Sequence, residues 1–339
     1  MRFEQFVPAL AELRVDVEIA PLLRDEYLER LYSRQPKAIG HILGDYLRRF
    51  PWLMQARRFD LLWIEKELFP DLPGWFEYLL NLLGVRYVVD YDDAIFHNYD
   101  LSANPWRRML GSKIDAVMRN ASLVVCGNGY LADRAVSAGA RRVEVLPTVI
   151  DLTRYSVRPS ACSEKMVVGW VGSAATVKYL DIAMPALRAL SKEYPVQLRV
   201  IGAEFSAPGI DVDCRLWSEN DEVRQIQKFD IGIMPLADSP WERGKCGYKL
   251  IQYMACGVPV IASPVGVNEV IVEDGASGYL ARDQDAWLDA FRRLASDSSA
   301  RKVFGSRGRQ LVEERYCLQV IAPRLAKLFK EVCISGRVR

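Results

Sequence analysis

The sequence contains few residues of the kinds that bind metal ions or form disulfides. Only two histidines and seven cysteines occur in 339 residues, and no two cysteines form a CxxC pair. Scattered cysteines in an odd number argue against a disulfide framework and against a structural zinc site. We therefore expect a protein of the reducing cytoplasm that has no metal site and needs no cofactor.

Long apolar runs and a strong net charge are also missing. No run reaches the roughly 20 apolar residues that span a bilayer, and polar residues interrupt residues 1–13 too often for a secretory signal. The net charge of +2 gives no reason to expect nucleic acid as a partner. Local basic residues leave open a weak peripheral contact with the inner face of a membrane, although a solvated helix face is the favoured interpretation. These residues are Arg48, Arg49, Arg57 and Arg58.

The length predicts two domains, because one hydrophobic core rarely serves this many residues. Alternating strand and helix patterns indicate α/β architecture in both halves. We expect a first domain over 1–152, a linker over 153–163, a second domain over 164–316, and a C-terminal helix over 317–339 that crosses back to the first domain. Residues 1–13 have a helical pattern, although Rossmann-like domains begin with a buried strand. The first domain is therefore expected to lack its first strand, with residues 15–20 as the next strand.

The most informative stretch is residues 241–280. Between Gly247 and Gly257 the apolar residues follow a helical spacing, and residues 258–262 have the pattern of a buried parallel strand. The start of a helix carries unpaired N–H groups and a partial positive charge, which attract phosphate. Arg243, Lys245 and Lys249 lie at that end, so a nucleotide diphosphate is the expected ligand.

This stretch resembles the signature of retaining glycosyltransferases of family four. The resemblance rests on KLIQYMACGVPVIAS and EDGASGYL, preceded by FDIGIMPL and VGWVGSAATVKYL. It implies the GT-B fold, in which two Rossmann-like domains face an interdomain cleft and the C-terminal domain holds the donor. It also implies retention of configuration, and a reaction in which lysines and helix ends neutralise the diphosphate without metal.

The resemblance suggests two sets of site residues. Lys178 matches the lysine that contacts the diphosphate in the family, and the loop that contains Asp93 and His97 corresponds to one facing the donor. The candidate catalytic residues are Lys178, Lys249, Glu242, Asp93 and His97. The candidate donor-binding residues are Gly172, Ser173, Arg243, Lys245, Gly247, Gln252, Val265, Gly266 and Val267.

Two departures from the family pattern concern charge. Gly172 or Ser173 stands where the family has an arginine, whose charge Arg243 or Lys245 would replace. Gly244 and Gln252 stand where the family has two glutamates, and Glu242 would serve the sugar if the loop is reshaped. An amide still hydrogen-bonds ribose hydroxyls, but more weakly than a carboxylate.

The acidic loop YDDAIFH, at the end of a predicted strand, allows three interpretations. Asp90, Asp92 and Asp93 could hold magnesium or manganese, although hard cations need more ligands than this loop offers. Asp93 or His97 could contact the sugar. The third interpretation is helix capping by solvated charges.

Taken together, these patterns predict a transferase that moves a sugar from a nucleotide-diphosphate sugar to a hydroxyl acceptor, in the synthesis of bacterial cell-surface glycans or glycoconjugates. The acceptor is unidentified, and a lipid-linked acceptor is one option. The alternative is a catalytically weakened GT-B protein that binds nucleotide sugar or assists assembly. A sugar-nucleotide epimerase of the same fold has no specific support.

Overall fold

A computed structural model describes residues 3–24, 26–27, 30, 39–157 and 164–334. The chain divides into two compact units. The first consists of Phe3–Leu146 and the chain from Pro323 onward, and the second of Pro147–Ala322. Each unit has its own parallel sheet, which confirms the expected α/β architecture.

The first unit alternates strands and helices along the chain. Its strands are β1 (Leu62–Glu65), β2 (Tyr87–Tyr91), β3 (Leu123–Cys126) and β4 (Val143–Val145). Its helices are α1 (Phe6–Glu12), α3 (Ile39–Met54), η1 (Ala56–Arg58), α4 (Trp75–Leu82), α5 (His97–Asp100), α6 (Pro105–Met109), α7 (Lys113–Asn120) and α8 (Gly129–Ser137). The last helix, α16 (Leu318–Ile334), begins in the second unit and ends in the first.

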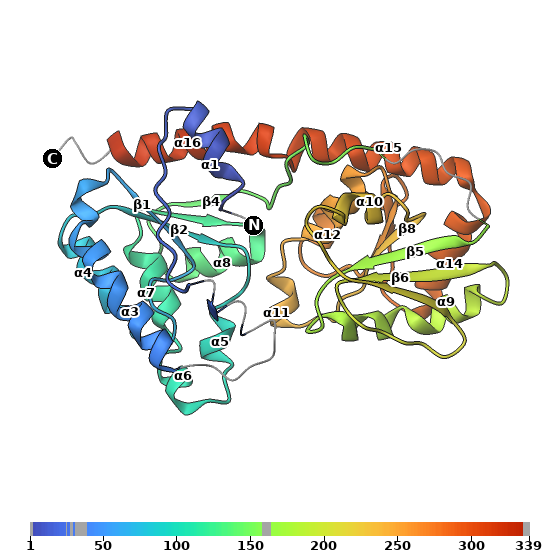
Figure 1. Ribbon diagram of the computed structural model, residues 1–339, viewed down its shortest axis with the longest axis horizontal. Coiled ribbons are helices and arrows are strands. Elements are labelled where there is room, and N and C mark those ends of the chain that lie inside the picture. The colour runs from blue at the N-terminus through green and yellow to red at the C-terminus, as the bar shows by residue number, and fades with distance from the viewer. Residues whose placement is uncertain (1–2, 25, 28–29, 31–38, 158–163, 335–339) are drawn as a thin grey trace. The chain divides into compact units, whose positions relative to one another are not determined.

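The sheet of the first unit has the consecutive order β1-β2-β3-β4, and all its pairs are parallel. Right-handed crossovers that all advance in one direction place the connecting helices on one face. The opposite face therefore needs another cover, which α1 and α16 provide (Figure 1). Trp63 of β1 packs against Phe6 and Phe329, with ring centroids 6.1 and 5.1 Å away. Arg142 also pairs with Glu331 of α16 at 2.8 Å.

The second unit is a longer series of the same kind. Its strands are β5 (Met166–Val171), β6 (Val196–Ile201), β7 (Asp211–Arg215), β8 (Ile231–Met234), β9 (Val260–Ala262) and β10 (Gly278–Leu280). Its helices are η2 (Val177–Ile182), α9 (Met184–Leu190), α10 (Glu222–Ile226), α11 (Pro240–Arg243), α12 (Tyr248–Ala255), α13 (Asn268–Ile271), α14 (Gln284–Ser296) and α15 (Ser298–Arg315).

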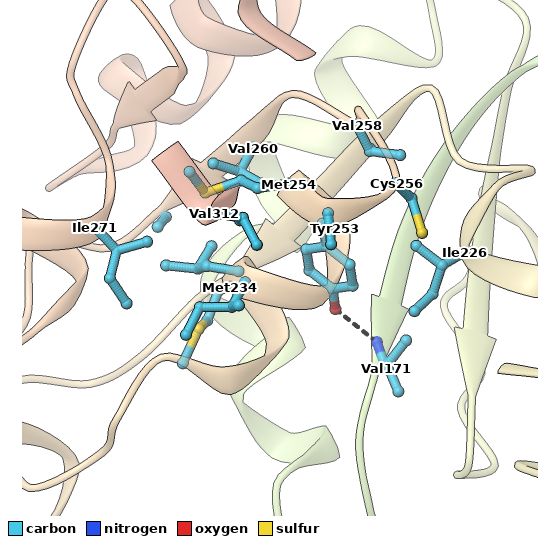
Figure 2. Packing of buried hydrophobic residues seen from close by; sticks show 14 of the residues in the cluster. Val171, Ile226, Met234, Tyr253, Met254, Cys256, Val258, Val260, Ile271 and Val312 are labelled. Carbon is cyan, nitrogen blue, oxygen red and sulfur yellow. Dashed lines mark hydrogen bonds between the residues drawn. The ribbon is translucent and has the colours of Figure 1, made fainter. Parts of the chain in front are cut away.

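The strand order of the second sheet is β10-β9-β8-β5-β6-β7, which is the doubly wound Rossmann order. The order reverses between β5 and β8, where Val168 pairs with Ile231. One core, which includes Trp287 of α14 and Leu187 of α9, covers one face. The other core includes residues of α12 and α15 (Figure 2). In this second core the Val171 N–H donates to the Tyr253 hydroxyl at 2.8 Å, which fixes α12 to the end of β5.

Several elements differ from the sequence-based expectations. Residues 15–20 form no strand, and among the described residues no strand precedes β1. A proline predicts a helix break, but Pro51 lies inside α3. The helical pattern over residues 105–120 predicts a single helix, which the structure divides into α6 and α7. The short strands β7 and β10 were not expected. Residues 22–32 have a helical pattern, and the structure describes residues 22–24, 26–27 and 30 of this range, of which 26, 27 and 30 are helical.

The boundary between the units falls after Leu146, earlier than the predicted linker over 153–163. Residues just before that linker already belong to the second unit. Ile150 forms a parallel bridge with Cys317, and Tyr155 is buried in the core beside α12. The apolar residues of this segment therefore pack in the second core rather than forming a hinge. Residues 158–163 lie outside the described residues.

Candidate functional site

The candidate site lies at the carboxyl edge of the second sheet, beside the point where the strand order reverses. In open α/β sheets ligands bind at this edge. Three connections meet there: the turn after β5, the segment after β8 that contains α11, and the loop after β9. They contain most of the residues predicted to bind the donor.

Lys249 lies directly beside the turn after β5. Its Nζ is 4.1 Å from the centroid of the Trp170 ring, a cation–π distance. A Cβ added at Gly172 would lie 2.7 Å from the same Nζ, so any larger residue would displace the lysine or the indole. The hydrogen bond between Val171 and Tyr253 holds the two elements together. Trp170 was not predicted, since its position within a buried strand gives no sign of a role beside a cation.

The electrostatic state of Lys249 is unusual. Burial, and after it the nearby charge of Lys245, lowers the pKa of its ammonium to about 7. A bound anion would raise this pKa again, because it replaces the lost hydration of the ammonium and attracts the proton. Such a group at the edge of a sheet is a candidate for binding a negatively charged ligand.

The helix that carries Lys249 begins without a side-chain cap. Gly247 occupies the N-cap position of α12 in a left-handed conformation, with φ of 69°. Gly247 has no side chain that could accept a hydrogen bond from the first turn of this helix. The helix dipole and the N–H groups of that turn therefore add positive potential to the end where Lys245 and Lys249 lie.

Glu242 is buried beside these cations and is held by two hydroxyl groups. Tyr179 donates to Oε1 of the carboxylate, and Ser239 donates to Oε2. Burial alone would raise the pKa of Glu242, but these hydrogen bonds outweigh it and lower the pKa below its usual value. Lys245 contributes to that lowering, as it does for Lys249, so the three side chains share one electrostatic environment.

Lys178 joins the same group of residues through Tyr179. Its Nζ lies 5.3 Å from the centroid of the Tyr179 ring, whose hydroxyl is bonded to Glu242. Lys178 is exposed, whereas Tyr179 is buried. The structure thus connects Lys178 to Lys249 through Tyr179, Glu242 and Lys245. Sequence reasoning missed Tyr179, although its place next to Lys178 in the motif was a usable signal.

Arg243 differs from the lysines because a neighbouring carboxylate already compensates its charge. Its Nε and Nη2 donate to the two oxygens of Asp238 at 2.6 and 3.0 Å. The arginine lowers the pKa of Asp238.

The predicted backbone donors divide into two groups. The N–H of Gly172 donates to Ile201 O at 2.9 Å, and the N–H of Val265 donates to Ser263 O at 2.8 Å. Both groups are used within the protein, which leaves Ser173, Gly266 and Val267 as candidates. Gly266 has a left-handed φ of 56°, and a Cβ there would lie 2.7 Å from Arg243 O. The loop after β9 therefore packs closely on the end of α11.

Gln252, predicted to bind ribose, points its amide nitrogen into a buried network. The Nε2 donates to the Tyr155 hydroxyl at 2.9 Å, and this hydroxyl donates to Glu222 at 2.7 Å. Trp217 donates to the other oxygen of Glu222 at 2.5 Å. The helical spacing correctly placed Gln252 one turn from Lys249, but it could not reveal that Tyr155 lies beside the amide.

Asp93 and His97 lie in the first unit, after β2. His97 is hydrogen-bonded through both ring nitrogens, at 2.8 Å from Asp100 Oδ1 and 2.8 Å from the Tyr130 hydroxyl. Lys66 pairs with Asp92 at 3.0 Å. Among the residues that the structure describes, no group of three or more His, Cys, Asp or Glu side chains is placed to hold a metal ion.

Comparison with solved structures identifies the fold. HepE from Anabaena, solved in complex with UDP and glucose, matches 95% of this chain and 88% of its own with a TM-score of 0.65 and 16% identity. Sucrose-phosphate synthase from Thermosynechococcus elongatus matches 89% of this chain and 80% of its own with a TM-score of 0.66 and 17% identity. The chain has the GT-B fold, as the resemblance implied.

Sequence comparison then identifies the family of the second unit. Residues 165–297 match the family described as glycosyl transferases group 1. The putative colanic acid biosynthesis glycosyltransferase WcaL of Escherichia coli is 24% identical over 70% of this chain and 63% of its own length. The capsular polysaccharide biosynthesis glycosyltransferase CapM of Staphylococcus aureus is 28% identical over 49% of this chain and 46% of its own. The second unit therefore contains a group 1 glycosyltransferase domain.

The match to these curated relatives is partial. The chain spans between 46% and 63% of the length of three of these relatives. Among the described residues, no helix is both long and apolar enough to cross a membrane.

Proposed function

We propose that the protein is a glycosyltransferase that moves a sugar from a nucleotide-diphosphate sugar to a hydroxyl acceptor. The proposed donor site is the carboxyl edge of the second sheet. The observation that carries the proposal is the desolvated Lys249 ammonium at the uncapped start of α12, beside Gly172 and within the field of Lys245. The group 1 glycosyltransferase domain and the fold shared with a UDP-bound protein support it.

The chemistry of sugar transfer explains why such a site is useful. When the bond between the sugar and the diphosphate breaks, negative charge grows on the leaving group. Fixed positive groups that meet this charge stabilise the transition state more than the ground state. We assign this role to Lys249 and Lys178, with Lys245 and the first turn of α12. Removal of one such contact typically raises the barrier by about 3 kcal/mol.

Glu242 is proposed to act next to the sugar. Its charge is maintained by Tyr179 and Ser239, so it can accept hydrogen bonds from sugar hydroxyls or orient the lysines. Asp93 and His97 remain candidates for the sugar and the acceptor. Retention of configuration and independence from metal are further parts of the proposal, in which lysines and the helix end balance the diphosphate charge.

The names of the relatives suggest the biological setting. WcaL and CapM are named for colanic acid and capsular polysaccharide biosynthesis. We propose that the product of this protein also belongs to a cell-surface glycan or glycoconjugate, made on the cytoplasmic side with a free or lipid-linked acceptor. The competing proposal is a weakened GT-B protein, favoured by Gly244 and by the engagement of Gln252 with Tyr155.

The decisive experiment is incubation of the purified protein with a panel of nucleotide sugars. We expect slow release of free nucleotide with the true donor, faster release when acceptor-containing extract is added, and little release by Lys249→Met. Donor binding without release under every condition would favour the weakened binder. Absence of both binding and release across the panel would contradict the proposed donor site.

A further inference from the structure

Helix α4 has the reverse of the usual distribution of polar and apolar residues. Its one charged residue, Glu77, is buried and accepts a hydrogen bond from the Leu68 N–H at 2.8 Å. Burial raises the pKa of this carboxyl. The exposed residues of the helix are large and mostly apolar: Trp75 (74% exposed), Tyr78 (51%), Leu79 (48%) and Leu82 (64%). They recur every three or four residues and therefore form one stripe.

Helix α3 shows the same inversion. Its one acidic residue, Asp45, is buried and pairs with Arg24, with Nε and Oδ1 2.6 Å apart. The exposed apolar residues again follow a helical spacing: Leu43 (60% exposed), Leu47 (59%), Phe50 (40%) and Met54 (86%). Two neighbouring helices thus bury their acids and expose their apolar side chains.

The two stripes belong to one surface. Phe50 of α3 contacts Phe76 of α4 with ring centroids 5.4 Å apart, and Arg57 Nη2 donates to Leu83 O at 3.2 Å. The helices therefore lie side by side with their carboxyl ends together (Figure 1). We name this surface the α3–α4 surface, formed by Leu43, Leu47, Phe50, Met54, Trp75, Tyr78, Leu79 and Leu82. Isolated exposed apolar residues are ordinary, but a contiguous set of this size indicates a binding surface.

The side chains with a fixed charge that α3, η1 and α4 themselves expose are all arginines. Exposed acids flank this segment: Glu26 lies beside His41 of α3, with Oε2 3.9 Å from Nδ1, and Asp60 follows Arg58 by two residues. Within Ile39–Arg58 and Trp75–Leu83 the acidic residues are Asp45 and Glu77, and both are buried. Arg48, Arg57 and Arg58 are exposed. An apolar surface whose own helices expose basic but no acidic side chains is complementary to an anionic lipid bilayer, where apolar side chains enter the acyl boundary and arginines meet phosphate groups.

We propose that the α3–α4 surface is a peripheral docking site for an anionic lipid bilayer. Trp75 and Tyr78 are suited to the interface, because aromatic side chains with a polar tip prefer the headgroup level. The favoured interpretation from sequence was a solvated helix face, since the arginines alone could not show that apolar side chains are exposed beside them. This proposal does not depend on the transferase reaction, because lipid binding requires neither donor nor acceptor.

The experiment is sedimentation of the full chain with large vesicles of phosphatidylcholine, or of an equal mixture with phosphatidylglycerol. We expect binding to the mixed vesicles and weaker binding to phosphatidylcholine alone. Trp75→Ser/Leu82→Ser should lower the partition coefficient about tenfold or more, since two exposed side chains no longer enter the bilayer. Arg57→Gln/Arg58→Gln should lower it on the order of tenfold, and added salt should abolish that difference.

Matched controls come from α15 in the second unit, where Val303 is 61% exposed and Lys302 is exposed. Val303→Ser and Lys302→Gln remove the same kinds of groups elsewhere and should leave vesicle binding unchanged. Equal losses in the controls and the α3–α4 variants would overturn the proposal, as would no binding to mixed vesicles. Formation of a dimer that Trp75→Ser/Leu82→Ser abolishes, with no vesicle binding, would assign the surface to a second copy of the chain instead.

Discussion

The two units are built from the same strand-and-helix alternation, but their sheets have different strand orders. The second sheet reverses direction between β5 and β8, whereas the first runs consecutively from β1 to β4. A reversal sends the neighbouring connections to opposite faces and leaves room for a ligand between them. The cations Lys245 and Lys249 lie at this place in the second unit, next to the glycine turn after β5. The first sheet has no reversal, and α1 and α16 cover the face that its own crossovers leave open.

Under the proposed function, strand order, more than composition, distinguishes the unit that would hold the diphosphate. Both units place polar residues after their strands. In the first unit these residues are paired with one another, as His97 is with Asp100 and Tyr130. In the second unit Lys249 has a cation and an aromatic ring as neighbours, and burial, followed by the charge of Lys245, lowers its pKa.

The largest expected effect is that of Lys249→Met. We expect kcat/KM to fall by about 100-fold or more, because a cation that meets the leaving diphosphate is lost. Steady-state kinetics with the donor found by the nucleotide-sugar panel would measure it. Lys302→Met, which removes an exposed lysine from α15, is the control. Equal activity of the Lys249 variant and the wild type would remove this lysine from the site.

The same substitution should make the protein more stable. The folded pKa of Lys249, about 7, lies below its ordinary value of 10.5, so between these pH values the unfolded chain binds more protons. Below pH 7 the lysine therefore lowers the free energy of unfolding by its full amount. This destabilisation disappears as the pH rises toward the pKa of the lysine in the unfolded chain. Thermal unfolding at pH 6 should show Lys249→Met more stable by on the order of 1 kcal/mol. If Lys249→Met is instead less stable than the wild type, its loss of activity would be attributed to misfolding rather than to the missing charge.

The second-largest effect, on UDP binding, is expected for substitution of Gly172 but not of Gly129, although both glycines follow strands. A Cβ at Gly172 would meet Trp170 and Lys249, whereas a Cβ at Gly129, after β3, has nothing within 4 Å. Gly172→Ala should weaken UDP binding on the order of tenfold or more, because the lysine must move. Gly129→Ala should leave UDP binding unchanged. Calorimetric titration with UDP measures both affinities. Equal UDP affinity of the two variants would contradict the proposed difference between the two units.

The third expected effect is a dependence of UDP binding on pH. In the proposed site the protonated form of Lys249 binds the diphosphate, and the pKa of this lysine in the free protein is about 7. Affinity should therefore fall as the pH rises above 7, by up to about tenfold per unit, until the raised pKa of the complex is passed. Titrations in buffers of different ionisation enthalpy should show proton uptake on binding at pH 8. Lys249→Met should abolish this uptake, and its persistence in that variant would assign the proton to another group.

A smaller effect is expected for Lys178→Ala. Lys178 is exposed and rests near the Tyr179 ring, so solvent screens its charge more than that of Lys249. We expect kcat to fall about tenfold with little change in UDP affinity, if its contact strengthens in the transition state. A change in UDP affinity without a change in kcat would make Lys178 a ground-state contact only.

The smallest effect on nucleotide binding is expected in the first unit. His97→Asn should leave UDP affinity within about twofold of the wild type, because no part of the proposed diphosphate site comes from that unit. Its proposed contact with sugar or acceptor would appear only in turnover. Loss of UDP binding in this variant would show that the first unit takes part in nucleotide binding.

The sequence predicted the second unit better than the first. Strong periodicity and glycine punctuation located α12 and β9 to within a few residues. The short strands β7 and β10 were not predicted, because an exposed edge strand such as Asp211–Arg215 lacks an apolar run. In the first unit, residues 15–20 alternate like a strand, yet no neighbouring strand pairs with them. Pairing is a tertiary property that alternation alone cannot reveal.

The candidate site was predictable in outline but not in its contacts. Helical spacing placed Lys249 at the start of its helix, and the glycine turn placed Gly172 after a strand. The partners that determine behaviour come from distant positions: Tyr155 beside Gln252, and Tyr179 on Glu242. Sequence separation hides such partners, because only the folded chain brings them together.

The most direct test of the central claim is a crystal structure of the protein grown with UDP. The account predicts that the diphosphate lies at the carboxyl edge of the second sheet, with a phosphate oxygen within hydrogen-bond distance of Lys249 Nζ and close to the first turn of α12. A diphosphate bound elsewhere, with Lys249 still packed on Trp170 and contacting no phosphate, would contradict it.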